Sequence, residues 1–463
     1  MPVNFLMTAT PILLLGVGLY YILALRGFFL LRPLGCIRLL FGGKREGGIS
    51  PFRALTVALA GTLGVGNIVG VASALYMGGA GAVFWMLVSA LPAMVLKYAE
   101  ITLALRHRRA LPDGGFTGGA PYYAEDGFTA MGLGRLGRLL AAVFTVLCLV
   151  NALTMGSLLQ VNAMAGAMET GFSVPPLLTG CGVAVLAVAA ALGGAKRIAA
   201  LTEKLVPIMT VGFLVVCLSV LILRRERIPA ALASVWEDAF TIKSAGAGIV
   251  GFLTSRGIRY GVMRGLVSNE AGCGTAPMAH ATARTDLPAR QGLFGLVEVF
   301  VDTVLLCTVT ALCILVSDSG PAFCGEDVTK TAGAAFSSVL GDWAEGFFAL
   351  SILLFGAATV ICWAHYGMTC VGYLFRKDRT KRIAEGVYTV GLAASLAVGA
   401  VTAPTLAWTV ADAAIAVMTI LNLLLLVLLR SEVKTETSIL LSSVPRRGRR
   451  ISCKEKQSER SQP

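Results

Sequence analysis

The chain has 463 residues, of which 56% are hydrophobic and only 14% are charged, and its mean hydropathy is +0.77. These values exceed what a soluble domain needs for its core, so the composition excludes an ordinary soluble protein and indicates an integral membrane protein. The formal net charge of +13 does not indicate nucleic-acid binding, because the basic residues form short clusters between apolar segments and in the tail.

Apolar segments in chain order predict about eleven transmembrane helices. Most have roughly 20 residues or more, enough at about 1.5 Å per residue to cross about 30 Å of hydrocarbon. A strand-like alternation of apolar and polar residues is absent, so the sequence predicts helices and not a membrane barrel. The predicted spans are 8–31, 54–77, 81–105, 139–168, 177–193, 201–223, 244–264, 291–317, 343–375, 384–403 and 405–430.

The distribution of Lys and Arg predicts an outside N-terminus and a cytoplasmic C-terminus, because cytoplasmic loops carry most basic residues. With this orientation most basic clusters lie inside, and the segment 264–292, rich in polar and small residues, becomes a cytoplasmic loop. The group at 224–227 is an exception on the outer side. Residues 431–463 are predicted to form a basic, disordered cytoplasmic tail that touches anionic lipid.

Ten predicted helices remain when the first helix and the basic loop after it, residues 1–53, are set aside. They divide into two sets of five, 54–223 and 244–430. An odd number of helices in each set gives the two sets opposite orientations in the membrane. This arrangement is typical of secondary transporters built from inverted repeats, in which discontinuous helices form the binding site.

The first helix of each set carries glycines in the middle of an apolar stretch. Residues 61–70 read GTLGVGNIVG, and residues 244–257 read SAGAGIVGFLTSRG. A bilayer tolerates broken helices only where the freed backbone groups are buried in protein or line a cavity. The two runs together predict a binding site at two helix breaks. The alternative is that the small residues only allow close helix packing.

Several longer stretches of the sequence closely resemble the alanine or glycine:cation symporter family, the sodium:alanine symporters. The resemblance extends in order from about residue 49 to residue 430 and is carried by GNIVGVA, GGAPYY, SNEAG, EVFVDT and LFGAATVICWAHYG. It implies the leucine-transporter fold with one extra helix before the ten-helix core. It also implies sodium-driven uptake of alanine or glycine, no enzymatic activity, and no cofactor other than the co-transported sodium ion.

The break at 61–70 provides the groups that a zwitterionic substrate needs. A carboxylate and an ammonium group must both be paired in a dry cavity. Backbone N–H groups between Gly64 and Asn67, through Val65 and Gly66, would bind the carboxylate, and freed carbonyls would bind the ammonium group and sodium. Asn67 is expected to donate to the carboxylate or to cap the second half-helix. Val65 stands where the family commonly has a threonine, so a hydroxyl is missing there.

The resemblance also implies that Gln160, Thr359 and Trp363 line the substrate pocket. Thr359 and Trp363 are four residues apart, so they lie on one face of a helix. Trp363 would form a wall that limits the substrate side chain to a methyl group or a hydrogen. The alternative for Gln160 and Thr359 is interhelical hydrogen bonding, and for Trp363 it is packing or interfacial anchoring.

Two carboxylates in the predicted eighth helix suggest an ion site or a gate. Asp302 lies near mid-depth, and Glu298 lies one turn closer to the cytoplasm. Either would bind a cation or pair with an arginine such as Arg256 or Arg259. Glu100 is expected to pair with Lys97.

Three alternative functions fit parts of the sequence. The first keeps the fold and couples transport to protons through Asp302, Glu298 or His365. The second is a membrane thiol enzyme built on Glu270, Cys273 and His280. The third is a sensor that binds substrate without transporting it. The partners expected for the favoured function are alanine or glycine, sodium and membrane lipids.

Overall fold

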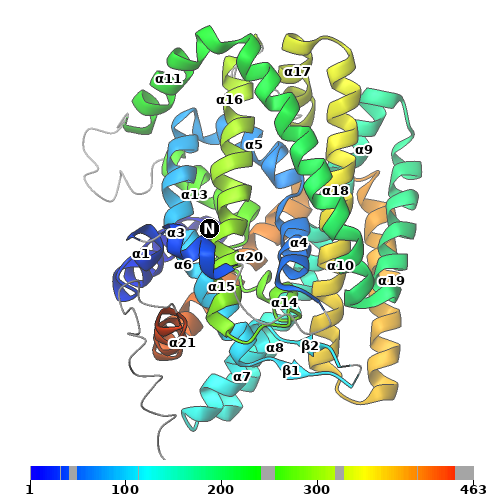
Figure 1. Cartoon of the computed structure of the whole chain (residues 1–463). Helices are drawn as coiled ribbons and strands as arrows, with labels where there is room; N and C mark the ends of the chain where they lie inside the picture. Colours follow the sequence, from blue (N-terminus) through cyan, green and yellow to red (C-terminus); the bar gives the residue numbers. More distant parts are fainter. Residues whose placement is uncertain are drawn as a thin grey trace, which may run out of the picture.

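The computed structural model describes residues 2–31, 33–40, 49–112, 114–240, 256–318, 328–403 and 405–443. Nearly all of this part of the chain is helical, and the long helices run side by side in one bundle (Figure 1). Within the described residues, six helical stretches are long and apolar enough to cross a membrane. These are Gly81–Arg106, Gly134–Phe172, Pro176–Leu223, Pro288–Val316, Trp343–Leu374 and Thr405–Leu428.

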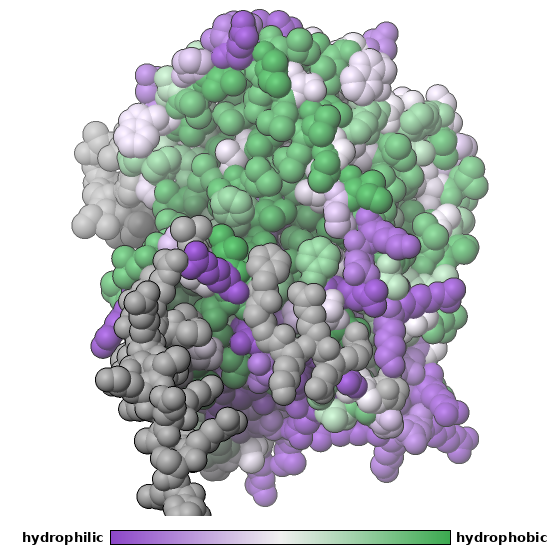
Figure 2. All heavy atoms as spheres, viewed as in Figure 1, coloured by the Kyte–Doolittle hydropathy of each residue, from purple (hydrophilic) through white to green (hydrophobic). Residues whose placement is uncertain are grey.

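The surface separates polar from apolar residues as a membrane protein requires. Most hydrophilic atoms visible in Figure 2 gather at the lower end, while the middle of this face is mainly hydrophobic. The long helix α10 (Pro176–Leu223) alone exposes large apolar side chains along its length, including Val185, Ile208, Val215 and Ile222. So large an exposed apolar surface fits contact with lipid.

The N-terminal region consists of α1 (Pro2–Ala24), α2 (Phe28–Leu31) and α3 (Pro33–Leu40). Helix α1 contacts α6 (Gly81–Arg106) and α20 (Thr405–Leu428). The Tyr21 hydroxyl donates a hydrogen bond to the main-chain oxygen of Leu426 at 2.5 Å. The extra helix predicted at 8–31 is therefore present and held against the core, but it begins at Pro2 and ends at Ala24, and the last part of the predicted span is the separate helix α2.

The helix predicted at 54–77 is broken as the glycine run indicated. Helix α4 (Pro51–Thr62) starts at Ser50, whose Oγ atom accepts a hydrogen bond from the Arg53 backbone N–H at 3.2 Å, and Pro51 occupies its first turn. One 3-10 turn, η1 (Val65–Asn67), follows the end of α4, and helix α5 (Val69–Gly78) continues the path. Apart from Gly66, which is partly exposed, the break is buried in protein.

The next helices form the first half of the bundle and contain two irregular points. Between α8 and α9 a wide turn of π type, η2, interrupts the α-helical pattern just before Gln160. The predicted spans 177–193 and 201–223 correspond to the two helical parts of α10, which a kink at Gly194 separates. Gly194 has a φ of 69°, a conformation that glycine adopts without steric cost. The remaining elements are β1 (Arg109–Ala110), β2 (Phe116–Thr117), α7 (Ala120–Ala130), α8 (Gly134–Leu153), η2 (Thr154–Leu158) and α9 (Leu159–Phe172).

The arginines at 224–227 have an acidic partner at their own end of the molecule. They lie at the 3-10 turn η3 (Arg225–Arg227), before helix α11 (Ile228–Phe240). Asp318 pairs with Arg224 and, at 2.7 Å, with Arg227. This partial neutralisation accounts for a basic cluster on the predicted outer side.

The structure corrects the prediction for the first helix of the second set. Most of the run at 244–257 lies outside the described residues, and the described helix α13 (Arg256–Asn269) extends beyond the predicted end at 264. A Cβ atom built on Gly78 would lie 3.3 Å from the main-chain oxygen of Arg256. The start of α13 therefore adjoins the end of α5, which is the predicted outer end, so Arg256, Arg259 and Arg264 do not lie in a cytoplasmic loop.

A second irregular segment follows α13 in a place the sequence did not indicate. Residues 270–276 connect α13 to the short helix α14 (Pro277–His280) and are fully buried. Positive φ angles occur at Glu270, Gly272 and Gly274. The stretch 264–292 was predicted to be a cytoplasmic loop, but residues 264–283 are buried throughout because their glycines and alanines allow tight packing.

The rest of the bundle follows the predicted spans closely. The 32-residue helix α18 covers the predicted span 343–375 except for its last residue and is unbroken. A second wide turn, η4, includes Asp302. The elements are α15 (Pro288–Val299), η4 (Phe300–Cys307), α16 (Thr308–Val316), α17 (Val328–Leu340), α18 (Trp343–Leu374), α19 (Asp378–Gly399), α20 (Thr405–Leu428) and α21 (Arg430–Ser442).

The prediction of a disordered tail from residue 431 is wrong for its first part. Helix α21 packs against α6 and α15 at the lower end of the bundle (Figure 1). Arg106 forms ion pairs with Glu432 at 2.6 Å and with Glu436 at 2.5 Å. Because Val433 and Leu440 are buried, α21 has an apolar face that holds it to the core. Residues 444–463 lie outside the described residues.

Candidate functional site

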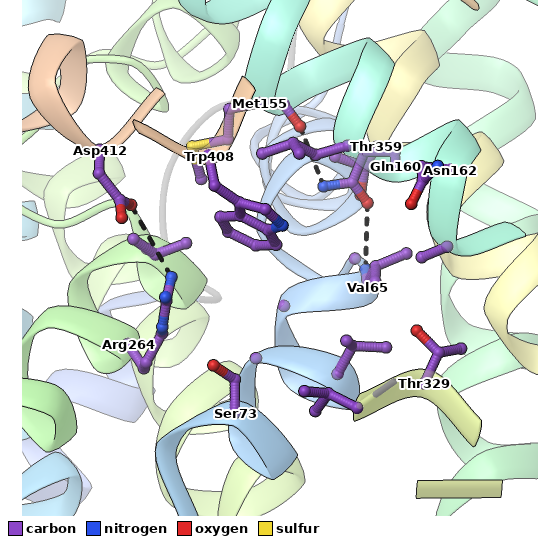
Figure 3. A pocket seen from close by; sticks show the side chains of 18 of the residues that line it. Val65, Ser73, Met155, Gln160, Asn162, Arg264, Thr329, Thr359, Trp408 and Asp412 are labelled. Carbon is purple, nitrogen blue, oxygen red and sulfur yellow. Dashed lines mark hydrogen bonds and ion pairs between the residues drawn. The ribbon is translucent and has the colours of Figure 1, made fainter. Parts of the chain in front are cut away.

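The broken helix lines a cavity of about 730 Å³. Of the predicted site residues, six line this cavity together: Gly64, Val65, Gly66, Gln160, Thr359 and Trp363. They come from the break, from α9 and from α18. The cavity also includes Ser73 in the middle of α5 (Figure 3). Val328 at the start of α17 and Thr405 at the start of α20 line it as well.

Side chains from other helices satisfy backbone groups at the break. The Val65 N–H donates to Gln160 Oε1 at 3.1 Å (Figure 3), and the Gly64 N–H donates to Asn67 Oδ1 at 3.0 Å. Thr359 Oγ1 donates to the main-chain oxygen of Ala60 at 3.0 Å. Buried backbone groups left unpaired would cost free energy, so these bonds stabilise the interrupted helix. They also place Gln160 and Thr359 beside main-chain donors and acceptors.

The close approach of neighbouring side chains explains two of the glycines. A Cβ atom at Gly64 would overlap Thr359 Oγ1 and would lie 3.1 Å from Gln160 Oε1. At Gly61 a Cβ atom would lie 2.8 Å from Cys362 Sγ. At Gly66 the nearest atom would be 3.7 Å away, which is ordinary contact. Gly61 and Gly64 are therefore required by packing of the break against α18.

The wide turn η2 brings Gln160 to the cavity. A π-type turn leaves carbonyl groups displaced from the regular pattern, and such turns are frequent at functional sites. The Gln160 Nε2 group donates to the Met155 main-chain oxygen at 3.2 Å. Its amide is thus oriented at both ends, with Oε1 directed at the break.

Among the cavity residues that were not predicted as site residues, Arg264, Trp408 and Asp412 lie together. The guanidinium carbon of Arg264 lies 4.9 Å from the centroid of the Trp408 ring, and Arg264 Nη1 lies 3.8 Å from Asp412 Oδ1. Trp408 and Asp412 belong to α20, and Figure 3 shows them across the cavity from Val65 and Gln160. An arginine within the apolar stretch VMRGLV is an unusual feature that could have marked this site.

Asn67 faces away from the cavity toward Asp302 and does not line the cavity wall. Its Nδ2 group donates to Asp302 Oδ1 at 2.7 Å and to Ser268 Oγ at 3.0 Å. Thr303 Oγ1 donates to Asp302 Oδ2 at 2.7 Å. Asn67 therefore links the break on one side to a buried polar cluster on the other, defined here as Asn67, Ser268, Asp302 and Thr303.

The polar cluster holds a carboxylate without a positive partner in the described part of the chain. Asp302 is completely buried, and its described contacts are an amide and hydroxyl groups. An isolated carboxylate anion at such depth is very costly, so the arrangement favours a bound cation or a proton on Asp302. The predicted pairing of Asp302 with Arg256 or Arg259 is wrong for the state described.

Glu298 also pairs with groups other than those predicted. Its Oε1 atom lies 3.2 Å from Lys97 Nζ, and Oε2 lies 2.9 Å from His280 Nε2. Gln291 Nε2 lies 2.9 Å from His280 Nδ1, which fits a neutral ring that donates to Glu298. Glu298 therefore belongs to a buried structural network, and Lys97 pairs with Glu298 where Glu100 was predicted.

The three residues of the thiol-enzyme hypothesis do not form a catalytic group. Cys273 Sγ contacts Thr419 Oγ1 at 3.4 Å, while His280 bonds with Glu298. Glu270 accepts hydrogen bonds from Thr275 and from Trp363. Because each side chain has separate partners, the nucleophile and base pairing that such catalysis requires is not formed.

Comparison with solved structures identifies the fold. MhsT in complex with L-phenylalanine superimposes with a TM-score of 0.55 at 16% sequence identity, covering 85% of this chain and 93% of that chain. The chain therefore has the leucine-transporter fold, as the sequence predicted.

Comparison with characterised and named sequences identifies the family. The "Sodium:alanine symporter family" matches residues 3–446. The "Sodium/alanine symporter AgcS" of Methanococcus maripaludis is 37% identical and covers 92% of both chains. The "Probable sodium/glutamine symporter GlnT" of Bacillus subtilis is 35% identical over 92% of this chain and 86% of its own length. The "Putative sodium/proton-dependent alanine carrier protein YrbD" of Bacillus subtilis is 32% identical, with coverages of 92% and 88%. The chain is a multi-pass membrane protein that belongs to the sodium:alanine symporter family.

Proposed function

We propose that the protein is a secondary symporter that imports a small neutral amino acid, alanine or glycine, together with sodium. The observation that carries this proposal is the break between Gly64 and Asn67, which lines a cavity together with Gln160, Thr359 and Trp363. Membership of the family and similarity to AgcS support the same substrate class.

The proposed substrate fits the chemistry of the cavity. The carboxylate of an amino acid would accept hydrogen bonds from backbone N–H groups of the break, and Gln160 would exchange its bond to Val65 for one to the ammonium group. The walls near the break include the apolar side chains of Val65, Met155 and Leu159. An uncharged substrate side chain is therefore favoured over a charged one.

The polar cluster around Asp302 supports coupling to a cation. Asn67 connects the break directly to Asp302, so a cation bound beside that carboxylate would change the energy of the break. A sodium ion prefers oxygen ligands, which Asp302, Ser268 and Thr303 provide. In this proposal, sodium binding stabilises the form of the break that accepts substrate.

The proposed direction follows the predicted orientation of the chain. The cavity extends from the break toward the end of the molecule that carries α11 and α17, which is the predicted outer side. The opposite end carries α7, the β1–β2 hairpin and α21, where Figure 2 shows dense polar side chains. We place the N-terminus outside, the C-terminus in the cytoplasm, and the cavity open to the outside.

The test is counterflow into proteoliposomes loaded with unlabelled alanine. Uptake of labelled alanine, glycine, glutamine and leucine is measured with sodium and with an equal concentration of choline at one fixed pH. We expect alanine and glycine to exchange only in sodium. Undiminished exchange without sodium would contradict sodium coupling, and saturable binding without exchange would indicate a sensor.

Proton coupling is the second candidate, favoured by the absence of a cationic partner for Asp302 in the described residues. One relative carries a name that includes both ions. A proton on Asp302 would neutralise the buried carboxylate, as a bound sodium ion would. An inward pH gradient that drives alanine accumulation in sodium-free buffer would support this candidate.

A further inference from the structure

Three contacts determine where the Trp363 ring lies in the cavity wall. Gly156 of η2 packs so closely on the ring that a Cβ atom there would lie 2.6 Å from Trp363 Cδ2. Tyr366 meets the ring edge-on at a centroid distance of 5.4 Å. The indole Nε1–H donates to Glu270 Oε1 at 3.0 Å. Only the last contact is a polar one that fixes the rotation of the ring.

Glu270 lies in the irregular segment between α13 and α14. It is buried and has a φ angle of 53°, which a non-glycine residue rarely adopts. Its second carboxylate oxygen accepts a hydrogen bond from Thr275 Oγ1 at 2.6 Å. Such backbone strain persists only where the surroundings determine the conformation. Here both oxygens are occupied, and one of them is directed at the cavity wall.

The segment that carries Glu270 is itself tied to α6 and α20. The Gly274 N–H donates to Glu100 Oε1 at 3.0 Å, and Asn422 Nδ2 donates to the Gly272 oxygen at 2.9 Å. Asn422 also bonds with Glu100. The segment is thus hydrogen-bonded to Trp363 through Glu270 and to two further helices through Gly272 and Gly274.

We propose that Glu270 is the positioning residue for Trp363 and thereby a determinant of which side chains the transporter accepts. This inference rests on the proposed function, in which the cavity binds a neutral amino acid. By accepting the indole N–H, Glu270 holds the ring against Gly156 and keeps the cavity narrow beside the break. Without an acceptor the buried N–H would be unsatisfied, and the ring would turn away to find another partner.

The test compares Glu270→Gln, which keeps an acceptor oxygen, with Glu270→Leu, which has similar bulk and no acceptor. Thr145→Val on α8 serves as the control, because it removes a buried side-chain hydrogen bond, Thr145 to Ala141, that is not part of this network. We expect Glu270→Leu to lower the preference for alanine over leucine at least tenfold, through the KM for alanine more than through kcat. We expect Glu270→Gln to stay within about threefold of the wild type.

A second readout reports on the ring itself. The chain has five tryptophans. In a variant that keeps only Trp363, all tryptophan fluorescence comes from this ring. The residues changed to phenylalanine are Trp85, Trp236, Trp343 and Trp408. We expect Glu270→Leu to shift this emission and Glu270→Gln to leave it in place. Unchanged emission and selectivity in Glu270→Leu would overturn the proposal. An equal loss of the preference for alanine in both variants would overturn it as well, because it would show that the negative charge of Glu270 is required and not its acceptor oxygen.

The two readouts separate this inference from the proposed function. If only Glu270→Leu shifts the emission and the wild-type protein binds no amino acid, the positioning role stands and the proposed function is refuted. Alanine transport with no effect of Glu270→Leu would do the reverse. Should Glu270→Leu fail to fold, Trp363→Phe removes the donor instead, and the proposal then requires the same loss of preference for alanine.

Discussion

The main-chain N–H of Val65 donates to the Oε1 atom of Gln160, so a side chain of α9 satisfies a backbone group exposed by the break in the first core helix. The two residues are 95 positions apart in the sequence. Their bond connects the interrupted helix to the adjoining wall of the cavity. Substrate binding at the break must therefore compete with Gln160 or use it.

Replacing Gln160 by leucine removes the acceptor at similar volume. The Val65 N–H would then be buried without a partner, at a cost of about 1–3 kcal/mol. We expect the KM for alanine to rise at least tenfold, measured as sodium-dependent uptake by proteoliposomes. Thr170→Val, which changes an exposed residue on the same helix, should stay near the wild type. Equal KM values in both variants would exclude a role for Gln160.

Gly64 cannot be replaced by alanine without moving α18 or Gln160. The added methyl group would overlap Thr359 Oγ1, and overpacking of this kind costs about 1–3 kcal/mol. We expect Gly64→Ala to reduce alanine binding ten- to a hundredfold, measured by equilibrium binding in detergent. Gly166→Ala on α9 is the control, since no atom lies within 4 Å of its added carbon. Tight binding by Gly64→Ala would contradict the packing argument.

The sequence predicted the break because the break depends on local features. Glycines within an apolar run marked the interruption, and the resemblance indicated Gln160, Thr359 and Trp363, which all line the cavity. It could not place Asn67 on the far side of the break, because that orientation depends on Asp302, 235 residues away. Pattern alone also misjudged 264–292. Small residues with a few polar ones are typical of loops, and only tertiary packing shows that residues 264–283 are buried.

Asp302 is expected to determine the response to sodium. Asp302→Asn keeps the shape and removes the negative charge that would attract a cation. We expect the apparent affinity for sodium to fall at least tenfold, about 1.4 kcal/mol, measured as sodium-dependent thermal stabilisation of the purified protein. Asp318→Asn, at the exposed pair with Arg227, is the control. If Asp302→Asn leaves the stabilisation by sodium unchanged, the cation does not bind beside Asp302.

The contact of α21 with the end of α6 should weaken in acid. The hydrogen bond from His107, together with the charge of Arg106, lowers the pKa of Glu432 below its ordinary value of 4.5. A carboxylate with a lowered pKa contributes stability that is complete above its ordinary pKa and is lost as the pH falls through the lowered one.

A cross-link between cysteines introduced on α21 and on α6, or proteolysis after residue 430, measures this docking between pH 7 and pH 3. We expect protection in the wild type to decrease below about pH 4.5, which follows from the linkage of proton binding to folding. Glu432→Gln should be less protected at pH 7 and should change less with pH. A wild-type profile that is flat over this range would show that Glu432 does not hold the helix.

Because the helix is interrupted, the site consists of a main-chain part and a side-chain part, and substitutions can alter the second without altering the first. In the proposed function, main-chain atoms of the break bind the groups that all amino acids share, and substitutions alter those atoms little unless a Cβ atom intrudes. The side chains beside the break, from η2, α9 and α18, would face the part in which amino acids differ. Redesign of the accepted side chain should therefore succeed on those three elements and leave residues 61–67 untouched.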